Sequence, residues 1–154
     1  MQFFNQKTFI LLIPILLAVL FYTIHKLIAY VKRKRAEELF ANYHKDRIIY
    51  FSKKVNFFGQ KSAGRSQIRG NGSLLLTADE LHFSRWIPKK SLVISLDDIE
   101  NIERVDSFLG KRKKRKLLKV DFNNNQGQKD SAAWYLDNMQ VWEKVIKDNL
   151  DSQE

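Results

Sequence analysis

The chain has 154 residues, which is enough for one modest domain and an appendage. Lys and Arg number 27 against 17 Asp and Glu, so the formal net charge is +10, and cysteine is absent from the sequence. A disulfide scaffold, a thiol nucleophile and a cysteine-ligated metal site are therefore excluded. Apolar residues make up 44% and charged residues 29% of the chain, a balance typical of a folded domain.

The positive charge is concentrated in two places. Residues 1–35 contain six Lys and Arg and no acid, and the run KRKKRK at 111–116 contains six more. Residues 36–154 hold 21 bases and 17 acids, so without that run this region is slightly acidic. This distribution disfavours a nucleic-acid binder with a uniformly basic surface.

Residues 9–24 (FILLIPILLAVLFYTI) carry no charge, and twelve of them are Leu, Ile, Val or Phe. Extension to Val31 gives the ~20 helical residues that a bilayer core of about 30 Å requires. A cleaved signal peptide is disfavoured because the positive cluster follows the apolar run and no small-residue cleavage site closes it. A buried core helix is disfavoured because the segment is apolar all round. We therefore expect a transmembrane anchor with a basic flank at residues 1–35.

The flanking charges predict the orientation of this anchor. The N-terminal side has only Lys7, whereas the C-terminal side has a juxtamembrane basic cluster: Lys32, Arg33, Lys34 and Arg35. The positive-inside rule places the basic side in the cytoplasm. We expect a single-pass protein of the cell (inner) membrane, with its N-terminus outside and its C-terminal domain cytoplasmic.

The remainder divides into a helical linker at residues 36–46 and a β-rich domain at 47–154. The linker either continues the membrane helix or joins it to the domain. The domain shows short runs rich in β-branched and aromatic residues, separated by turn residues. We expect strands at 47–58, 73–77, 81–87, 91–96, 99–105, 116–122 and 130–136.

A helix is expected after the last strand. Asp137 is its predicted N-cap, with Gln140 as the capping-box partner. Its apolar stripe consists of Met139, Trp142, Val145, Ile146 and Leu150. The pattern predicts a mainly β fold, in which seven antiparallel strands form a small barrel or sandwich with the C-terminal helix plugging an open end.

The run at 111–116 is the sharpest functional feature. Six adjacent cations repel one another, so we expect them in an exposed loop between the fifth and sixth strands. An anionic phospholipid surface is one ligand for such a patch, and a solvated loop, or simple reinforcement of the cytoplasmic topology, explains the run equally well. Nucleic acid is disfavoured because no aromatic residues interleave with the bases. The candidate binding residues are Lys111, Arg112, Lys113, Lys114, Arg115 and Lys116, with Lys89 and Lys90 in support.

No catalytic or metal-binding constellation is visible in the sequence. The three histidines, including His82 on an outward strand position, lack the spacing of metal ligands. Asp130 and Ser131 are adjacent, but no histidine is placed to activate the serine. Trp86 is expected on the outward side beside Lys89, and RGNG at 69–72 is expected to form a turn. We therefore expect no enzyme activity, no cofactor and no metal.

Residues 47–150 resemble bacterial pleckstrin-homology-like and GRAM-like domains. The stretches that carry the resemblance are RGNGSLLLTADELHF at 69–83, IPKKSLVISLDDIENIE at 87–103, LGKRKKRKLLKVDF at 109–122 and DSAAWYL at 130–136. Trp142 stands where pleckstrin-homology domains keep a helix tryptophan. The resemblance implies a seven-strand barrel capped by a helix that binds phospholipid headgroups or protein segments. The phosphoinositide-binding members gather bases around the first inter-strand loop, where this chain has Lys61, Arg65 and Arg69.

Together these features predict a non-catalytic binding module that is held at the inner membrane surface. Its partners would be anionic lipid, a protein, or both. The alternative is a structural or assembly subunit of a membrane protein complex that recognises no lipid.

Overall fold

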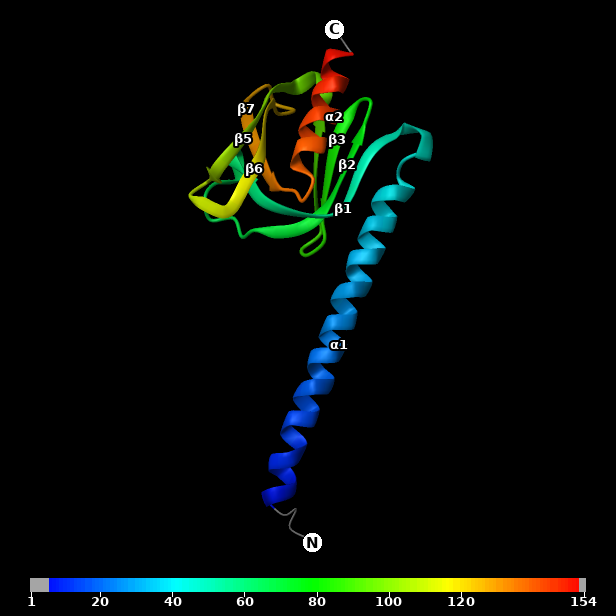
Figure 1. Ribbon diagram of the computed structural model, residues 1–154, viewed down its shortest axis with the longest axis vertical. Coiled ribbons are helices and arrows are strands. Elements are labelled where there is room, and N and C mark those ends of the chain that lie inside the picture. The colour runs from blue at the N-terminus through cyan, green and yellow to red at the C-terminus, as the bar shows by residue number, and fades with distance from the viewer. Residues whose placement is uncertain (1–5, 153–154) are drawn as a thin grey trace. The chain divides into compact units, whose positions relative to one another are not determined.

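The computed structural model of the protein describes residues 6–152, with side chains from residue 12 onward (Figure 1). Residues 1–5 of the expected anchor, the side chains of 6–11, which include Lys7, and residues 153–154 lie outside the described part. The chain divides into two compact units between Lys34 and Arg35. Its helices and strands are α1 (Gln6–Ala41), β1 (Ile48–Gln60), β2 (Gly70–Thr77), β3 (Glu80–Arg85), β4 (Lys90–Ser95), β5 (Ile99–Phe108), β6 (Lys111–Asn123), β7 (Lys129–Tyr135) and α2 (Met139–Asp151).

Helix α1 confirms the predicted N-terminal apolar helix. It has 36 residues, and Pro14 lies inside it. At 1.5 Å per residue it is about 54 Å long, well beyond the ~30 Å of a bilayer core. Within the described residues it is the one helix long and apolar enough to cross a membrane, and the most apolar 18-residue stretch of its Leu12–Ala41 portion has a mean hydropathy of 2.0. By length and composition it is a candidate membrane span or signal anchor.

The seven predicted strands are confirmed and form one antiparallel sheet. Their order is β4-β3-β2-β1-β7-β6-β5. The sheet is not closed into a barrel, because β4 and β5 stand at its two edges and do not pair with each other. It curves instead around α2, which confirms the predicted C-terminal helix (Figure 1).

Strand β1 joins the two halves of the sheet. Its N-terminal part pairs with β2 and its C-terminal part pairs with β7. The register shifts along both ladders, between Ser52 and Val55 and between Phe57 and Gly59. Such irregularities bend a strand, so β1 serves both halves. Its residues near the crossing therefore lie beside β2 and β7 together.

Helix α2 covers the inner face of the sheet. Trp142 and Ile146 are fully buried in the main core. The Trp142 indole Nε1 donates a hydrogen bond to Ser52 Oγ at 2.9 Å, and its ring meets the Tyr50 ring edge-on at 4.9 Å between centroids. The predicted cap is wrong: the helix begins at Met139, after an Asn138 N-cap whose side chain makes no capping hydrogen bond.

Residues 39–43 lie against the opposite, outer face of the sheet. Leu39 is 2% exposed, and the Phe40 ring packs edge-on against Phe51 at 4.8 Å between centroids. Trp86, predicted on the exposed side, is buried, and its Nε1 donates to Ser73 Oγ at 3.1 Å. The alternation of β3 was correct, but the sequence did not show that a distant segment covers this face.

The RGNG segment forms no turn, because residues 70–72 begin β2. A Cβ atom on Gly72 would lie 2.3 Å from Phe83 Cε2 and 2.4 Å from the backbone oxygen of Ser84. Glycine is therefore required here by the close approach of β3. The turn signal of Asn-Gly is overridden by strand packing.

Replacement of Trp142 by alanine tests the role of α2 in the core. We expect W142A to lower the free energy of unfolding by about 3–5 kcal/mol, because it removes a large buried ring and leaves the Ser52 hydroxyl without its partner. Val141 is 43% exposed on the same helix, and V141A should stay within about 0.5 kcal/mol of wild type. Urea unfolding of the full chain in detergent micelles measures both. Equal effects of the two variants would show that α2 contributes little to the core.

Candidate functional site

The basic run does not form a loop; it lies in β6. Strands β5 and β6 form a hairpin closed by Leu109 and Gly110, whose φ angles are 50° and 75°. Val105 pairs with Leu117 and Ser107 pairs with Arg112. Four residues of β6, 113–116, therefore lie opposite one residue of β5. We call these four residues the β6 bulge. Repulsion between adjacent cations correctly predicted that residues 112–116 are exposed, but the irregular strand in which they lie was not predicted.

The hairpin tip beyond the bulge packs onto the outer face of the sheet. Phe108 and Leu117 cluster there with Phe58 and Ala133. Lys111 Nζ donates to the backbone oxygens of Phe58, at 3.2 Å, and of Gln67. Its pKa is lowered by burial and further by the nearby Arg69 guanidinium. Lys111, predicted as a binding residue, therefore fixes the hairpin tip to the sheet.

The other cations of the run are exposed, and three of them, Lys114, Arg115 and Lys116, form no ion pair within residues 12–152. The residue of β5 opposite the bulge is Asp106. By contrast with these three cations, several surface lysines of the domain are paired with acids at 3.0 Å or less: Lys119, Lys129, Lys144 and Lys147. The β6 bulge thus carries more positive charge than the acids near it neutralise.

The supporting cations Lys89 and Lys90 belong to a different hairpin, between β3 and β4. Lys89 Nζ lies 3.3 Å from Glu38 Oε2, an oxygen that also accepts from Arg35 at 2.6 Å. Lys90 is exposed and stands opposite Arg85 in the ladder. These two lysines therefore extend the positive surface on another element, and Lys89 is partly neutralised. Arg35 of the juxtamembrane cluster is likewise engaged by Glu38.

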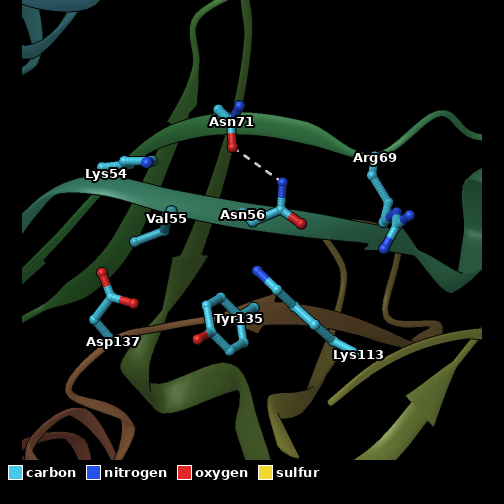
Figure 2. Close-up of a pocket in the computed structure, with 8 residues that line it drawn as sticks. All are labelled: Lys54, Val55, Asn56, Arg69, Asn71, Lys113, Tyr135 and Asp137. Atoms are coloured by element: carbon cyan, nitrogen blue, oxygen red, sulfur yellow. Dashed lines mark hydrogen bonds between the residues drawn. The ribbon is translucent and has the colours of Figure 1, made fainter. Parts of the chain in front are cut away.

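A pocket of about 370 Å³ adjoins the β6 bulge (Figure 2). Its floor is the outer face of the sheet where β1 crosses between β2 and β7. Arg69, which directly precedes β2, and Lys113 of the bulge contribute cationic side chains to its wall. The lining residues are Lys54, Val55, Asn56, Arg69, Asn71, Lys113, Tyr135 and Asp137.

The pocket contains three cations and one carboxylate. Lys113 Nζ lies 3.3 Å from the centroid of the Tyr135 ring, and Arg69 Cζ lies 5.1 Å from that of Phe58. Burial lowers the pKa of Lys113; the Asp137 carboxylate opposes this shift, and the positive charges of Arg69 and others add to it. The ring contacts hold both cations in place, although the positive charges of Lys113 and Arg69 still repel each other.

Most of this pocket escaped the sequence analysis. The outward alternation of Lys54 and Asn56 along β1 was an available signal, but nothing near them in the sequence points to Lys113 or Asp137. Of the bases in the first inter-strand loop, the pocket uses Arg69; Lys61 and Arg65 are exposed and do not line it.

Asp130 and Ser131 form a structural joint. Asp130 is 3% exposed and accepts hydrogen bonds from Gln60 Nε2 at 2.6 Å and from both the backbone nitrogen and Oγ of Ser62, at 2.9 and 2.6 Å. Burial acts to raise its pKa, but these hydrogen bonds outweigh burial and lower it. The carboxylate therefore fastens the connection after β1 to β7.

A second polar cluster lies under residues 39–43. Tyr43 Oη donates to the Glu80 carboxylate and lies 2.7 Å from His82 Nδ1. His82 Nε2 is buried without a hydrogen-bond partner. Burial lowers the pKa of His82, and the Glu80 charge opposes the shift; burial and Glu80 both raise that of Tyr43. The described residues contain no His, Cys, Asp and Glu group that could hold a metal ion.

This cluster predicts a pH dependence of stability. The pKa of His82 is lower in the folded protein than in the unfolded chain. The neutral imidazole therefore makes its full contribution to stability above about pH 6.5, and this contribution is lost as the pH falls toward the folded pKa. The free energy of unfolding, measured with urea, should therefore decline from pH 7.5 to pH 5, and the decline should be shallower in H82Q. Tyr43, whose pKa is raised by burial and by the Glu80 carboxylate, stays neutral over this range. The same slope in both proteins would contradict a buried neutral imidazole.

No protein-family model and no curated protein matches this sequence. Among solved structures, the chain is similar to the C-terminal domain of an unknown protein from Leishmania infantum, with 17% identity, a TM-score of 0.48 and coverage of 80% of this chain and 98% of that one. It is also similar to a chain of the 8S snRNP assembly intermediate, with 8% identity, a TM-score of 0.51 and coverage of 71% and 83%. At these identities the second likeness concerns the fold alone.

Proposed function

We propose that the protein is a single-pass membrane protein whose β-rich domain is a non-catalytic binding module for the anionic inner surface of the cell membrane. The apolar α1, with the KRKR cluster after it, supports a span with the domain in the cytoplasm. The strand order and the buried Trp142 of α2 agree with the resemblance to pleckstrin-homology-like modules.

The observation that carries the proposal is that three exposed cations of the β6 bulge, Lys114, Arg115 and Lys116, form no ion pair within residues 12–152. A Lys or Arg that reaches an anionic leaflet contributes about 1 kcal/mol. Lys114, Arg115 and Lys116 form no ion pair that would have to break first, so together they contribute about 3 kcal/mol to binding of the anionic surface. The ion-paired lysines elsewhere on the domain would first have to lose their partners. Because screening limits such attraction to about 8 Å at physiological salt, the bulge must lie close to the headgroups.

Two exposed isoleucines support the same contact. Ile68, in the connection between β1 and β2, is 79% exposed, and Ile87, in the turn between β3 and β4, is 58% exposed. Each stands one or two residues from a base, Arg69 and Lys89 respectively. Apolar side chains beside cations suit the boundary between headgroups and acyl chains.

The proposal predicts that the bulge brings the domain to anionic lipid. The chain has no cysteine, so S107C carries a single donor dye, and energy transfer to headgroup-labelled lipid in nanodiscs measures proximity. We expect stronger transfer with 30% phosphatidylglycerol than with phosphatidylcholine alone. Lys114→Ser, Arg115→Ser and Lys116→Ser combined should weaken the contact by about a hundredfold, because about 3 kcal/mol is removed.

The matched control removes three paired cations from other elements: Lys129, Lys144 and Lys147, all changed to Ser. It should leave the energy transfer close to the wild-type value, and 0.5 M salt should abolish the difference between the two triple variants. If both triple variants behave as wild type, lipid contact through the bulge is wrong. The assembly-subunit alternative would then account for the domain.

The proposed topology is tested separately in cells. Ser152 is exposed near the C-terminus, so we expect S152C to resist a membrane-impermeant maleimide in intact cells and to react after permeabilisation. Replacement of Lys32, Arg33, Lys34 and Arg35 by Gln should expose a fraction of S152C to the outside, because the positive-inside bias is removed. Full labelling of S152C in intact cells would place the domain outside.

A further inference from the structure

We propose that the pocket beside the β6 bulge is a specific site for a small organic phosphomonoester. Three cations converge on it from separate parts of the sheet: Lys54 from β1, Arg69 from the start of β2 and Lys113 from β6. With Asp137 the lining has a net charge of +2. A phosphomonoester is a dianion above its second pKa of about 6, so it matches this charge.

The cations are held ready for an anion. Lys113 rests on the Tyr135 ring and Arg69 on the Phe58 ring. The segment before Arg69 is fixed by Gln67, whose Nε2 donates to the backbone oxygens of Gln60 and Gly64 at 2.5 and 2.6 Å. A site whose side chains are already ordered loses less entropy when a ligand binds.

The floor offers neutral hydrogen-bond donors. Asn56 Nδ2 donates to Asn71 Oδ1 at 3.0 Å. That bond orients the Asn71 amide, whose own NH₂ group remains available as a donor. In Figure 2 the Lys113 ammonium reaches toward Asn56, above the Tyr135 ring. A phosphate seated between Lys113, Arg69 and the asparagines would therefore receive charged and neutral donors together.

Asp137 gives the pocket a negatively charged hydrogen-bond acceptor beside its cations. Figure 2 shows Asp137 on the other side of Tyr135 from Arg69. A second phosphate would be repelled there, whereas a hydroxyl or ammonium group would find an acceptor. A volume of about 370 Å³ also exceeds what a single inorganic phosphate fills and lies in the range of small-ligand sites. The ligand class is thus a phosphomonoester that carries a donor a few bonds away.

This site does not depend on the proposed lipid contact. A soluble metabolite and a lipid headgroup can both carry a phosphomonoester, so the experiment has one arm for each source. The first arm uses the full chain in maltoside micelles and glycerol 3-phosphate as the probe, followed by isothermal titration calorimetry at pH 7.5. We expect R69Q and K113Q each to weaken binding about tenfold or more, because each removes a charge-assisted hydrogen bond. K144Q removes an exposed charge on α2 that does not line the pocket and should change the affinity less than twofold.

Two further variants separate loss of the Lys113 charge from loss of the fold and test the role of Asp137. K113R retains the charge and should keep most of the affinity even if K113Q disturbs the fold, which thermal unfolding reports. D137A should tighten inorganic phosphate and reduce the advantage of glycerol 3-phosphate over it. Absence of binding, or binding unchanged in R69Q and K113Q, overturns the site. An unchanged ratio in D137A overturns the role given to Asp137.

The second arm identifies the source of the ligand. Nanodiscs with phosphatidic acid, a monoester, are compared with phosphatidylglycerol discs of equal surface charge by the S107C energy transfer. If the ligand is a headgroup, K113Q lowers the transfer on phosphatidic acid discs alone. If it is soluble, K113Q leaves both disc types unchanged while the calorimetric loss remains. The triple bulge variant should lower the transfer on both disc types, so failure of the lipid contact and failure of the pocket are separately visible.

Discussion

The mismatch between β5 and β6 is the constraint on which the functional surface depends. Residues 113–116 have one partner residue on β5, so they cannot all pair as a regular ladder. A bulge bends its strand and leaves extra residues unpaired. Here the bend brings Phe108 onto Phe58 and turns Lys113 toward Tyr135. One irregularity thus creates both the exposed cations and one wall of the pocket.

The distribution of ion pairs explains why the excess charge stays local. Glu38, Glu100, Glu103 and Glu143 each engage cations from other elements or turns. These exposed pairs contribute little to stability, typically less than about 1 kcal/mol each. Their effect is to neutralise the surface outside the bulge. Residues 36–154 are slightly acidic apart from residues 111–116, so this run supplies the excess positive charge of that part of the chain.

The sequence predicted what depends on local pattern. Alternation of apolar residues located all seven strands, and the stripe through Trp142 and Ile146 located α2. The pattern could not show which distant segment covers a face: His82 and Trp86 point outward as predicted, yet both are buried, and the contact of Tyr43 with His82 comes from the segment after α1.

The remaining errors arose where two local rules competed. Six adjacent cations predict a loop, but a hairpin with a bulge relieves their repulsion while Lys111 still pairs. Asp137 has the chemistry of an N-cap, yet the helix begins two residues later and the carboxylate lines the pocket instead. The pocket itself joins residues 54, 69, 113 and 137, and a set so dispersed has no sequence period. Its chemistry emerges from the crossing of β1 between the two halves of the sheet.

A tether changes what strength of binding is useful. A contact of about 3 kcal/mol is weaker than a millimolar affinity, which corresponds to about 4 kcal/mol, and it would not hold a soluble protein at a membrane. A short covalent link gives an effective concentration in the millimolar range, and under the proposed topology α1 supplies that link. The bulge would then decide how the domain is oriented, not whether it is present. A phosphomonoester in the adjoining pocket would cancel part of the same positive charge, so its occupancy would compete with the leaflet for that orientation.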